Sequence, residues 1–355
     1  MRMKNELRAV LALALAGCAL AGCGTTPPQP PPVMARGVAL REPLVSPRPY
    51  GAADAAFGLG GPGVMVDASD QVWTDPSLIT LHSYLDAVAT GYDAGVARVP
   101  LLHSPDQVTR EIDQAIATAT RGLIPQLLAP GSLQGIGWVL TDALYLKAAW
   151  ATPFQASQTG PGSFTTASGR QVSAQFMNGG PYAAASANGW TAVWLPYGDG
   201  RLAMMALLPP AGRAGCAMPS AAQLGSLATR LTASGTADPL LTRDISLPKV
   251  NLQDHVSMRD LLTGLGMGVA FTPAADFSGL SPQACCIGLV EHAATLQVGE
   301  QGTVASAATA VGVVPTAAQA GPPPVTFDRP YLMVVTDRTT REPLFMARVA
   351  DPTRP

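Results

Sequence analysis

Charged side chains are scarce in this 355-residue chain, at 13% of residues against 47% hydrophobic ones. The formal net charge is −2 at pH 7, so there is no excess of basic residues to neutralise a phosphate backbone. This composition excludes nucleic acid as an expected partner. The length and the hydrophobic content are instead ample for one sizeable core.

Histidine and cysteine are also rare. None of the four histidines lies within a local nucleophile or zinc motif, and neither Gly-x-Ser-x-Gly nor a phosphate loop is present. We therefore expect no cofactor, no metal and no enzyme activity, although a triad assembled from distant positions stays open. After the N-terminal segment only Cys216, Cys285 and Cys286 remain, without metal-ligand spacing. The adjacent pair is poorly placed for a mutual bond, so we expect buried or free thiols, with a disulfide from Cys216 possible.

The N-terminal apolar run, residues 9–22, is too short to span a membrane comfortably. It follows a basic start and ends in small residues, which is typical of an export signal. Its last four residues, Leu20-Ala21-Gly22-Cys23, resemble a bacterial lipobox, which predicts removal of residues 1–22 and lipidation of Cys23. A second copy of this four-residue pattern ends at Cys18. We prefer Cys23 as the lipidated residue because it leaves the longer apolar region before it. The alternative is an ordinary cleaved signal in which the cysteine is incidental.

A proline-rich stretch follows, and we interpret residues 23–41 as a tether and 42–355 as one domain. These features predict an exported bacterial lipoprotein, held by its N-terminal lipid to a membrane at the periplasm or the cell surface.

Hydrophobic periodicity predicts an α+β domain. Apolar residues at three- and four-residue spacing indicate a helix over residues 107–128. Asp254 is a plausible N-cap for a short helix through Leu265, stopped by Gly266. Runs rich in β-branched and aromatic residues predict the strands, near residues 137–147, 190–197, 202–208, 330–336 and 343–349.

Residues 298–314 form an unusual run of small side chains. From Gly302 the run has no charge, aromatic residue or proline until Pro315. If it is extended, one face carries Thr303, Ala305, Ala307, Thr309, Val311 and Val313. Both faces could be buried within a sheet, so the segment suits either a loop or a strand. The alternative is a plain surface loop of small residues.

Blocks of sequence in a fixed order resemble the serpin family across most of the domain. No single block is decisive, but the ordered set is specific. The blocks include Leu140–Trp150, Leu195-Pro196-Tyr197, Leu202–Pro209, Leu247-Pro248-Lys249, Asp276-Phe277-Ser278-Gly279, Glu300-Gln301-Gly302-Thr303, Asp328-Arg329-Pro330-Tyr331 and Phe345–Val349.

This resemblance implies a large central β-sheet, two smaller sheets, surrounding helices and an exposed reactive-centre loop at about residues 300–324. It also implies a monomer that inhibits serine proteases by suicide cleavage, forming a covalent complex while the cleaved loop enters the main sheet as a strand.

The resemblance assigns roles to particular residues. The hinge comprises Glu300, Gln301, Gly302, Thr303, Ala305, Ala307 and Ala308. Counting from Glu300 places the reactive bond at Thr316-Ala317, within a window from Val314 to Ala320 whose residues are small or aliphatic except Gln319. We therefore expect an elastase-like or subtilisin-like target.

Four residues match positions that control loop entry into the sheet in this family: Lys249, His292, Asp142 and Ser46. Lys249 would pair with Glu300, and Asp142 would sit near His292; the alternatives are solvated surface charges and a satisfied core histidine. The N-terminal helical region looks shortened, and Asp70, Asp113 and Asp142 replace asparagines of the family pattern. The alternative function is therefore a degenerate, non-inhibitory serpin-like binding protein or protease substrate at the cell envelope.

Overall fold

The computed structural model describes residues 64–92, 95–212, 218–233, 242–303, 323–339 and 343–354. The predicted export signal, tether and reactive bond fall outside these ranges. So do the individual predictions for Cys23, Ser46, Cys216, Ala305, Ala307, Ala308, Thr316 and Ala317.

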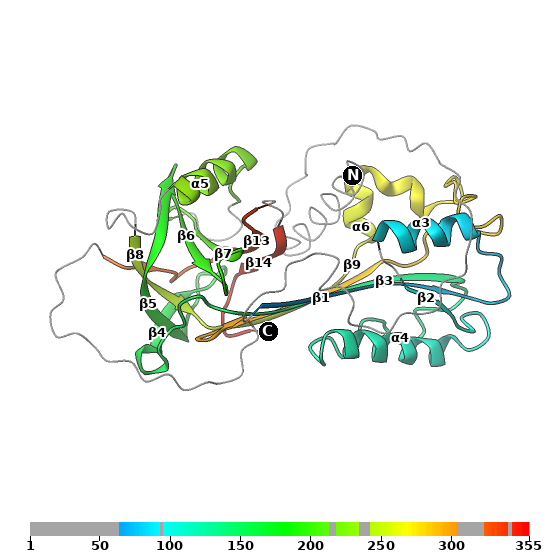
Figure 1. The fold of residues 1–355 in the computed structure, drawn as a ribbon, viewed down its shortest axis with the longest axis horizontal. Coiled ribbons are helices and arrows are strands. Elements are labelled where there is room, and N and C mark those ends of the chain that lie inside the picture. The colour runs from blue at the N-terminus through cyan, green and yellow to red at the C-terminus, as the bar shows by residue number, and fades with distance from the viewer. Residues whose placement is uncertain are drawn as a thin grey trace.

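A six-stranded sheet runs through the centre of the molecule (Figure 1). Its strands lie in the order β2-β1-β3-β11-β10-β9; β1 and β2 are parallel and every other pair is antiparallel. The bounds are β1 Val64–Thr74, β2 Gly95–Arg98, β3 Trp138–Ala149, β9 Val250–Ser257, β10 Glu291–Gly299 and β11 Gly302–Thr303.

A second, eight-stranded sheet has the order β12-β8-β5-β6-β7-β13-β14, with β4 also paired to β5. The long strand β5 belongs to two halves of this sheet, because its pairing with β8 shifts register between Gly179 and Tyr182. These halves correspond to the two smaller sheets that the resemblance implied. The bounds are β4 Gly160–Thr165, β5 Gln171–Ala187, β6 Trp190–Pro196, β7 Leu202–Leu208, β8 Thr242–Pro248, β12 Val325–Thr326, β13 Tyr331–Asp337 and β14 Pro343–Val349.

Helices cover both faces of the six-stranded sheet. Figure 1 shows α4 on one side of it and α3 and α6 on the other, while α5 lies on the eight-stranded sheet. The bounds are α3 His82–Tyr92, α4 Pro105–Ala119, α5 Ala221–Ala233 and α6 Arg259–Leu262.

The two faces of the six-stranded sheet contribute to different cores. Alternate residues such as Leu146, Ala148, Leu296 and Val298 pack with aromatic residues of the eight-stranded sheet. The opposite face packs against α4, and that cluster includes Val139 of β3 and Ala293 of β10. The period-two alternation of strand side chains therefore decides which core each residue enters.

Most of the predicted elements are confirmed, and one is wrong. Strands lie at or within two residues of all five predicted positions, and the predicted helix is present as α4 but stops at Ala119. Arg121 and Gly122 have positive φ angles there, which terminates a helix. Asp254 does not cap a helix: it lies in β9 opposite Ala294, and the helix starts only at Arg259.

Asp113 shows why an acidic residue is accepted where the family pattern has asparagine. Its Oδ1 accepts hydrogen bonds from the backbone N–H groups of Leu127 (2.8 Å) and Leu128 (2.9 Å). An asparagine carbonyl oxygen could accept the same two bonds, so both side chains can fix the segment after α4.

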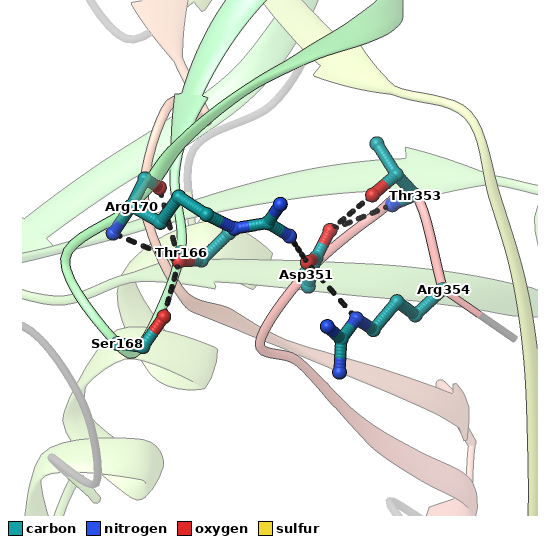
Figure 2. A network of polar contacts seen from close by, with 6 residues as sticks. All are labelled: Thr166, Ser168, Arg170, Asp351, Thr353 and Arg354. Carbon is teal, nitrogen blue, oxygen red and sulfur yellow. Dashed lines mark hydrogen bonds and ion pairs between the residues drawn. The ribbon is translucent and has the colours of Figure 1, made fainter.

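The C-terminal segment is tied to the turn between β4 and β5 (Figure 2). The Asp351 carboxylate accepts hydrogen bonds from Thr353 and lies 3.2 Å from Arg170 and 3.6 Å from Arg354. Burial raises the pKa of Asp351, but the hydrogen bonds from Thr353 and the charge of Arg170 outweigh it and lower the pKa overall. Both arginines are largely exposed, so each ion pair contributes at most about 1 kcal/mol.

Candidate functional site

The two-residue strand β11 lies between β3 and β10, at the start of the segment that the resemblance predicts to be the reactive-centre loop. Gly302 and Thr303 face Ala149 and Ala148 on one side and Gly299 and Val298 on the other. Within the described residues no strand ladder joins β3 directly to β10. Beyond β11, residues 138–147 of β3 and 291–297 of β10 therefore form two facing edges with no strand described between them.

Gly302 is required by the close approach of β11 to β3. Its φ is +142°, and a Cβ there would lie 2.0 Å from the Ala148 carbonyl oxygen and 2.7 Å from the Ala149 Cα. Both contacts are with backbone, which cannot rotate away as a side chain can. Only glycine allows the chain to enter the sheet at this point.

The turn between β10 and β11 is held by the end of β3 and the residues after it. The Trp150 indole N–H donates to the Gly299 carbonyl at 2.9 Å. The backbone N–H groups of Trp150 and Phe154 donate to the carbonyls of Gln301 and Glu300, both at 2.9 Å. Three donors thus fix three successive carbonyls of the turn, which satisfies backbone groups that the short strand leaves unpaired.

An ion pair closes the same turn from the other side. Lys249 Nζ lies 2.9 Å from Glu300 Oε2, with the lysine side chain 43% exposed and the glutamate 18%. Burial raises the pKa of Glu300, but hydrogen bonding and the charge of Lys249 lower it overall. The structure therefore places Lys249 and Glu300 in contact, at the positions where the resemblance expects a pair.

The Thr303 side chain points into the core between the two sheets. It is 1% exposed, and its hydroxyl lies 2.6 Å from the Tyr197 hydroxyl. The Tyr197 ring stacks on Trp150 with 4.4 Å between centroids. Burial raises the pKa of Tyr197 despite the hydrogen bond from Thr303, so the phenol stays protonated and keeps its hydrogen bond at neutral pH.

Asp142 and His292 occupy the same level on the two facing edges. Thr303 lies between Ala148 of β3 and Val298 of β10. Asp142 precedes Ala148 by six residues and His292 precedes Val298 by six, so the two residues lie level with each other. On its other side Asp142 is the cross-strand partner of Asp70. The side chains of Asp70 and Asp142 lie outside what the structure describes, so their predicted effect on His292 stays a prediction.

His292 is a half-buried residue whose described charged neighbours are Asp254 and His255. Burial lowers the pKa of His292, and the nearby His255 adds to this, while Asp254 opposes it. The more exposed His255 lies 3.3 Å from Glu291 and so faces the other side of the sheet. His292 therefore favours the neutral form in the folded protein.

Sequence patterns predicted the hinge residues but not the residues whose backbone and indole N–H groups contact Gly299, Glu300 and Gln301 in the structure. Trp150, Phe154 and Tyr197 are distant from Glu300 in sequence, and only their presence in family blocks marks them. Among the described residues, no three His, Cys, Asp or Glu side chains gather where they could hold a metal ion. No described helix has the length and apolar character needed to cross a bilayer.

Replacing Gly302 with alanine should destabilise the fold by about 1–3 kcal/mol, because the new Cβ meets the backbone of β3. Gly299→Ala is the matched control: it lies in the same turn, and the nearest atom to its added Cβ is Lys249 Cε at 3.9 Å. Urea unfolding followed by fluorescence measures both. Equal stabilities for the two variants would contradict the close-approach argument.

Stability should fall as the pH drops below the ordinary histidine pKa of 6.5, because His292 has a lowered pKa when folded and the unfolded chain then binds more protons. The loss should continue until the pH reaches the folded-state pKa. Thermal melts between about pH 7 and pH 5 should show a smaller slope in His292→Gln than in the wild type. His255→Gln should reduce this slope less than His292→Gln does, because burial is the larger cause of the lowered His292 pKa and His255 only adds to it. An unchanged slope in His292→Gln would contradict the assignment to His292.

Comparison with known proteins agrees with this architecture. The family model described as serpin (serine protease inhibitor) matches residues 60–352. Serpin-Z1B from Triticum aestivum is 31% identical over 89% of this chain and 80% of its own length. A protein named serine protease inhibitor from Cyanea capillata is 28% identical over 81% of this chain and 76% of its own.

The fold is also shared with a solved structure. The crystal structure of human glycosylated kallistatin superimposes with a TM-score of 0.71 at 23% identity, over 85% of this chain and 78% of kallistatin. The chain therefore belongs to the serpin family, whose members are mostly protease inhibitors rather than enzymes, although some are non-inhibitory.

Proposed function

We propose that this protein inhibits serine proteases by being cleaved and then inserting its loop between β3 and β10. The observation that carries the proposal is β11 itself. Gly302 and Thr303 already occupy the first two positions of a strand between β3 and β10. The sequence that follows continues with small uncharged residues to Val314, none of which would oppose extension of that strand.

The register of β11 specifies what each loop residue would meet on insertion. Two residues past Thr303, Ala305 would lie between Leu146 and Leu296, which are 3% and 5% exposed. Val304 would lie between Lys147 and Gln297, on the opposite and more exposed face. The small residues on the Thr303 face match the side that needs to be buried.

A buried hydroxyl on β10 fits the same register. Thr295 Oγ1 is buried and has no hydrogen-bond partner among the described residues. Continuing the pairing of Thr303 with Val298 places Ser306 directly opposite Thr295. Cross-strand Thr–Ser pairs can hydrogen-bond, so insertion would supply the partner that this hydroxyl lacks.

The covalent step uses the protease's own chemistry. Its serine oxygen attacks the carbonyl carbon of the residue before the cleaved bond, the peptide C–N bond breaks, and the new amine leaves with a proton. The resulting ester links the protease to the loop. Insertion then carries the protease away from its attack site, distorting it before water can hydrolyse the ester. The added strand pairs with both facing edges and supplies the driving free energy.

The target follows from the side chains around the predicted reactive bond. Thr316 and Ala317 lie in the window from Val314 to Ala320, where no residue is basic. A protease with a shallow, apolar specificity pocket, elastase-like or subtilisin-like, fits such a sequence. Cleavage that required a basic residue would contradict this assignment.

A non-inhibitory role is the second candidate, and one observation favours it. Asp70 and Asp142 are directly opposite each other on β1 and β3. Like charges at opposed positions destabilise a sheet. Such a sheet would bind the loop less tightly, leaving a protein that is cleaved without trapping the protease.

Mixing the protein with an elastase-like or subtilisin-like protease should give an SDS-stable covalent complex. The fraction that is cleaved without trapping should melt at a higher temperature than the intact protein, because the inserted strand adds to the sheet. Clean cleavage near Thr316 with neither complex nor thermal gain would support the non-inhibitory candidate instead.

Ala305→Glu should convert the protein into a simple substrate, because insertion would then bury a carboxylate between Leu146 and Leu296. Val304→Glu is the matched control and should still trap, since its flanking residues lie on the more exposed face. SDS gels of each variant with the protease separate complex from cleaved protein. Loss of trapping in Val304→Glu alone would show that the register is shifted by one residue.

We also propose that the protein is an exported bacterial lipoprotein anchored through Cys23. The support is the sequence Leu20-Ala21-Gly22-Cys23 after a basic start and an apolar run. A proline-rich tether would then hold the inhibitory domain away from the membrane, at the periplasm or the cell surface.

Palmitate labelling in a bacterial host should be lost in Cys23→Ala and kept in Cys18→Ala, and globomycin should block processing of the wild type. Labelling that depends on Cys18 would move the processing site to the earlier copy. Complete absence of labelling in the wild type would indicate an ordinary cleaved signal.

A further inference from the structure

Two adjacent thiols lie exposed on a loop that the inhibitory mechanism does not use. Cys285 and Cys286 are both exposed free cysteines, and their Sγ atoms lie 2.7 Å apart. The loop leads from the region after α6 into β10, which starts five residues after Cys286. The two sulfurs lie close together and both cysteines are exposed, so of the two expected states, buried or free thiols, the structure shows free, exposed ones.

The backbone on both sides of the pair is anchored. After the pair, Ile287 donates its N–H to the Ala270 carbonyl at 2.8 Å, and Arg259 donates to the Ile287 carbonyl at 3.4 Å. Before it, Gln283 donates its N–H to Ser281 Oγ at 3.1 Å and accepts from the Ile79 N–H at 2.8 Å. The juxtaposition of the sulfurs is therefore part of a fixed loop.

The geometry favours a reversible bond over a structural one. Adjacent Cα atoms are about 3.8 Å apart, which is shorter than the usual span of a disulfide. A bond between them closes a strained ring and is easily reduced. Among the described residues no third ligand joins the pair to form a metal site. The hydrogen bond to Cys286 raises the pKa of Cys285, so reaction through its thiolate should quicken as the pH rises.

We propose that Cys285 and Cys286 form a reversible redox site that reacts with small-molecule disulfides. One protein thiolate attacks the small disulfide, forms a mixed disulfide and releases one small thiol. The neighbouring thiolate then attacks the protein sulfur of that mixed disulfide and releases the second small thiol. The protein loses two hydrogens, the small disulfide gains them, and electrons balance. This inference does not depend on protease inhibition.

Oxidised glutathione is the probe, applied to the reduced full-length protein before alkylation, trypsin digestion and mass spectrometry. Both cysteines fall in the tryptic peptide that begins at Asp260, which contains no other cysteine, whereas Cys216 lies in the peptide that begins at Ala214. We expect the Asp260 peptide to lose two hydrogens and both alkylatable thiols, and a reductant to restore them.

Cys285→Ser and Cys286→Ser are the matched controls. Each should stop at a stable mixed disulfide with glutathione, because the attacking partner is missing. A wild-type peptide that stays fully alkylatable, or that retains glutathione without closing the ring, would overturn the proposal. Dimers linked through this peptide on a non-reducing gel would also overturn it, since the bond would then join two chains.

Discussion

The close approach of the Gly302 backbone to Ala148 and Ala149 is the constraint on which the rest of the site depends. It puts β11 in register with β3 and, through Val298 and Gly299, with β10. The contacts around it all act on the same turn: the Trp150 indole, the Lys249–Glu300 ion pair and the Thr303–Tyr197 hydrogen bond. Each holds the start of the strand that, in the proposed mechanism, the reactive loop would extend.

The facing edges of β3 and β10 both contribute to the apolar cluster on the α4 side of the sheet. The apolar cluster beneath α4 contains Val139 from one edge and Ala293 from the other. Because packed cores resist deformation, the edges cannot separate without disturbing this cluster. Admission of a new strand therefore involves the packing of α4 as well as the hydrogen bonds of the sheet. In the proposed mechanism, resistance to insertion would therefore lie in the core, and the initial alignment of the strand in the Gly302 turn.

Local composition was a good guide where a short apolar run is bounded by turn residues. The run at 202–208 was predicted as a strand and forms β7 over the same residues, since every side chain of this strand is buried. The helix predicted to start at Asp254 is wrong. Aspartate is a favoured N-cap residue, but the pairing of β9 with β10 overrides this local preference. Helix α4 was predicted too long because apolar residues continue past Gly122, the glycine whose positive φ accompanies the end of the helix.

The sequence alone determined the family, the α+β class and the small-residue alternation that makes residues 303–313 fit for either loop or strand. Only the tertiary structure showed that Thr303, the first residue of that alternation, is buried. It showed Thr303 against Tyr197, and it placed Asp142 and His292 at one level of the facing edges. It also showed that Cys285 and Cys286 face solvent together. Alternation and family blocks are local properties of the chain, whereas register and burial arise from contacts between residues that are far apart in sequence.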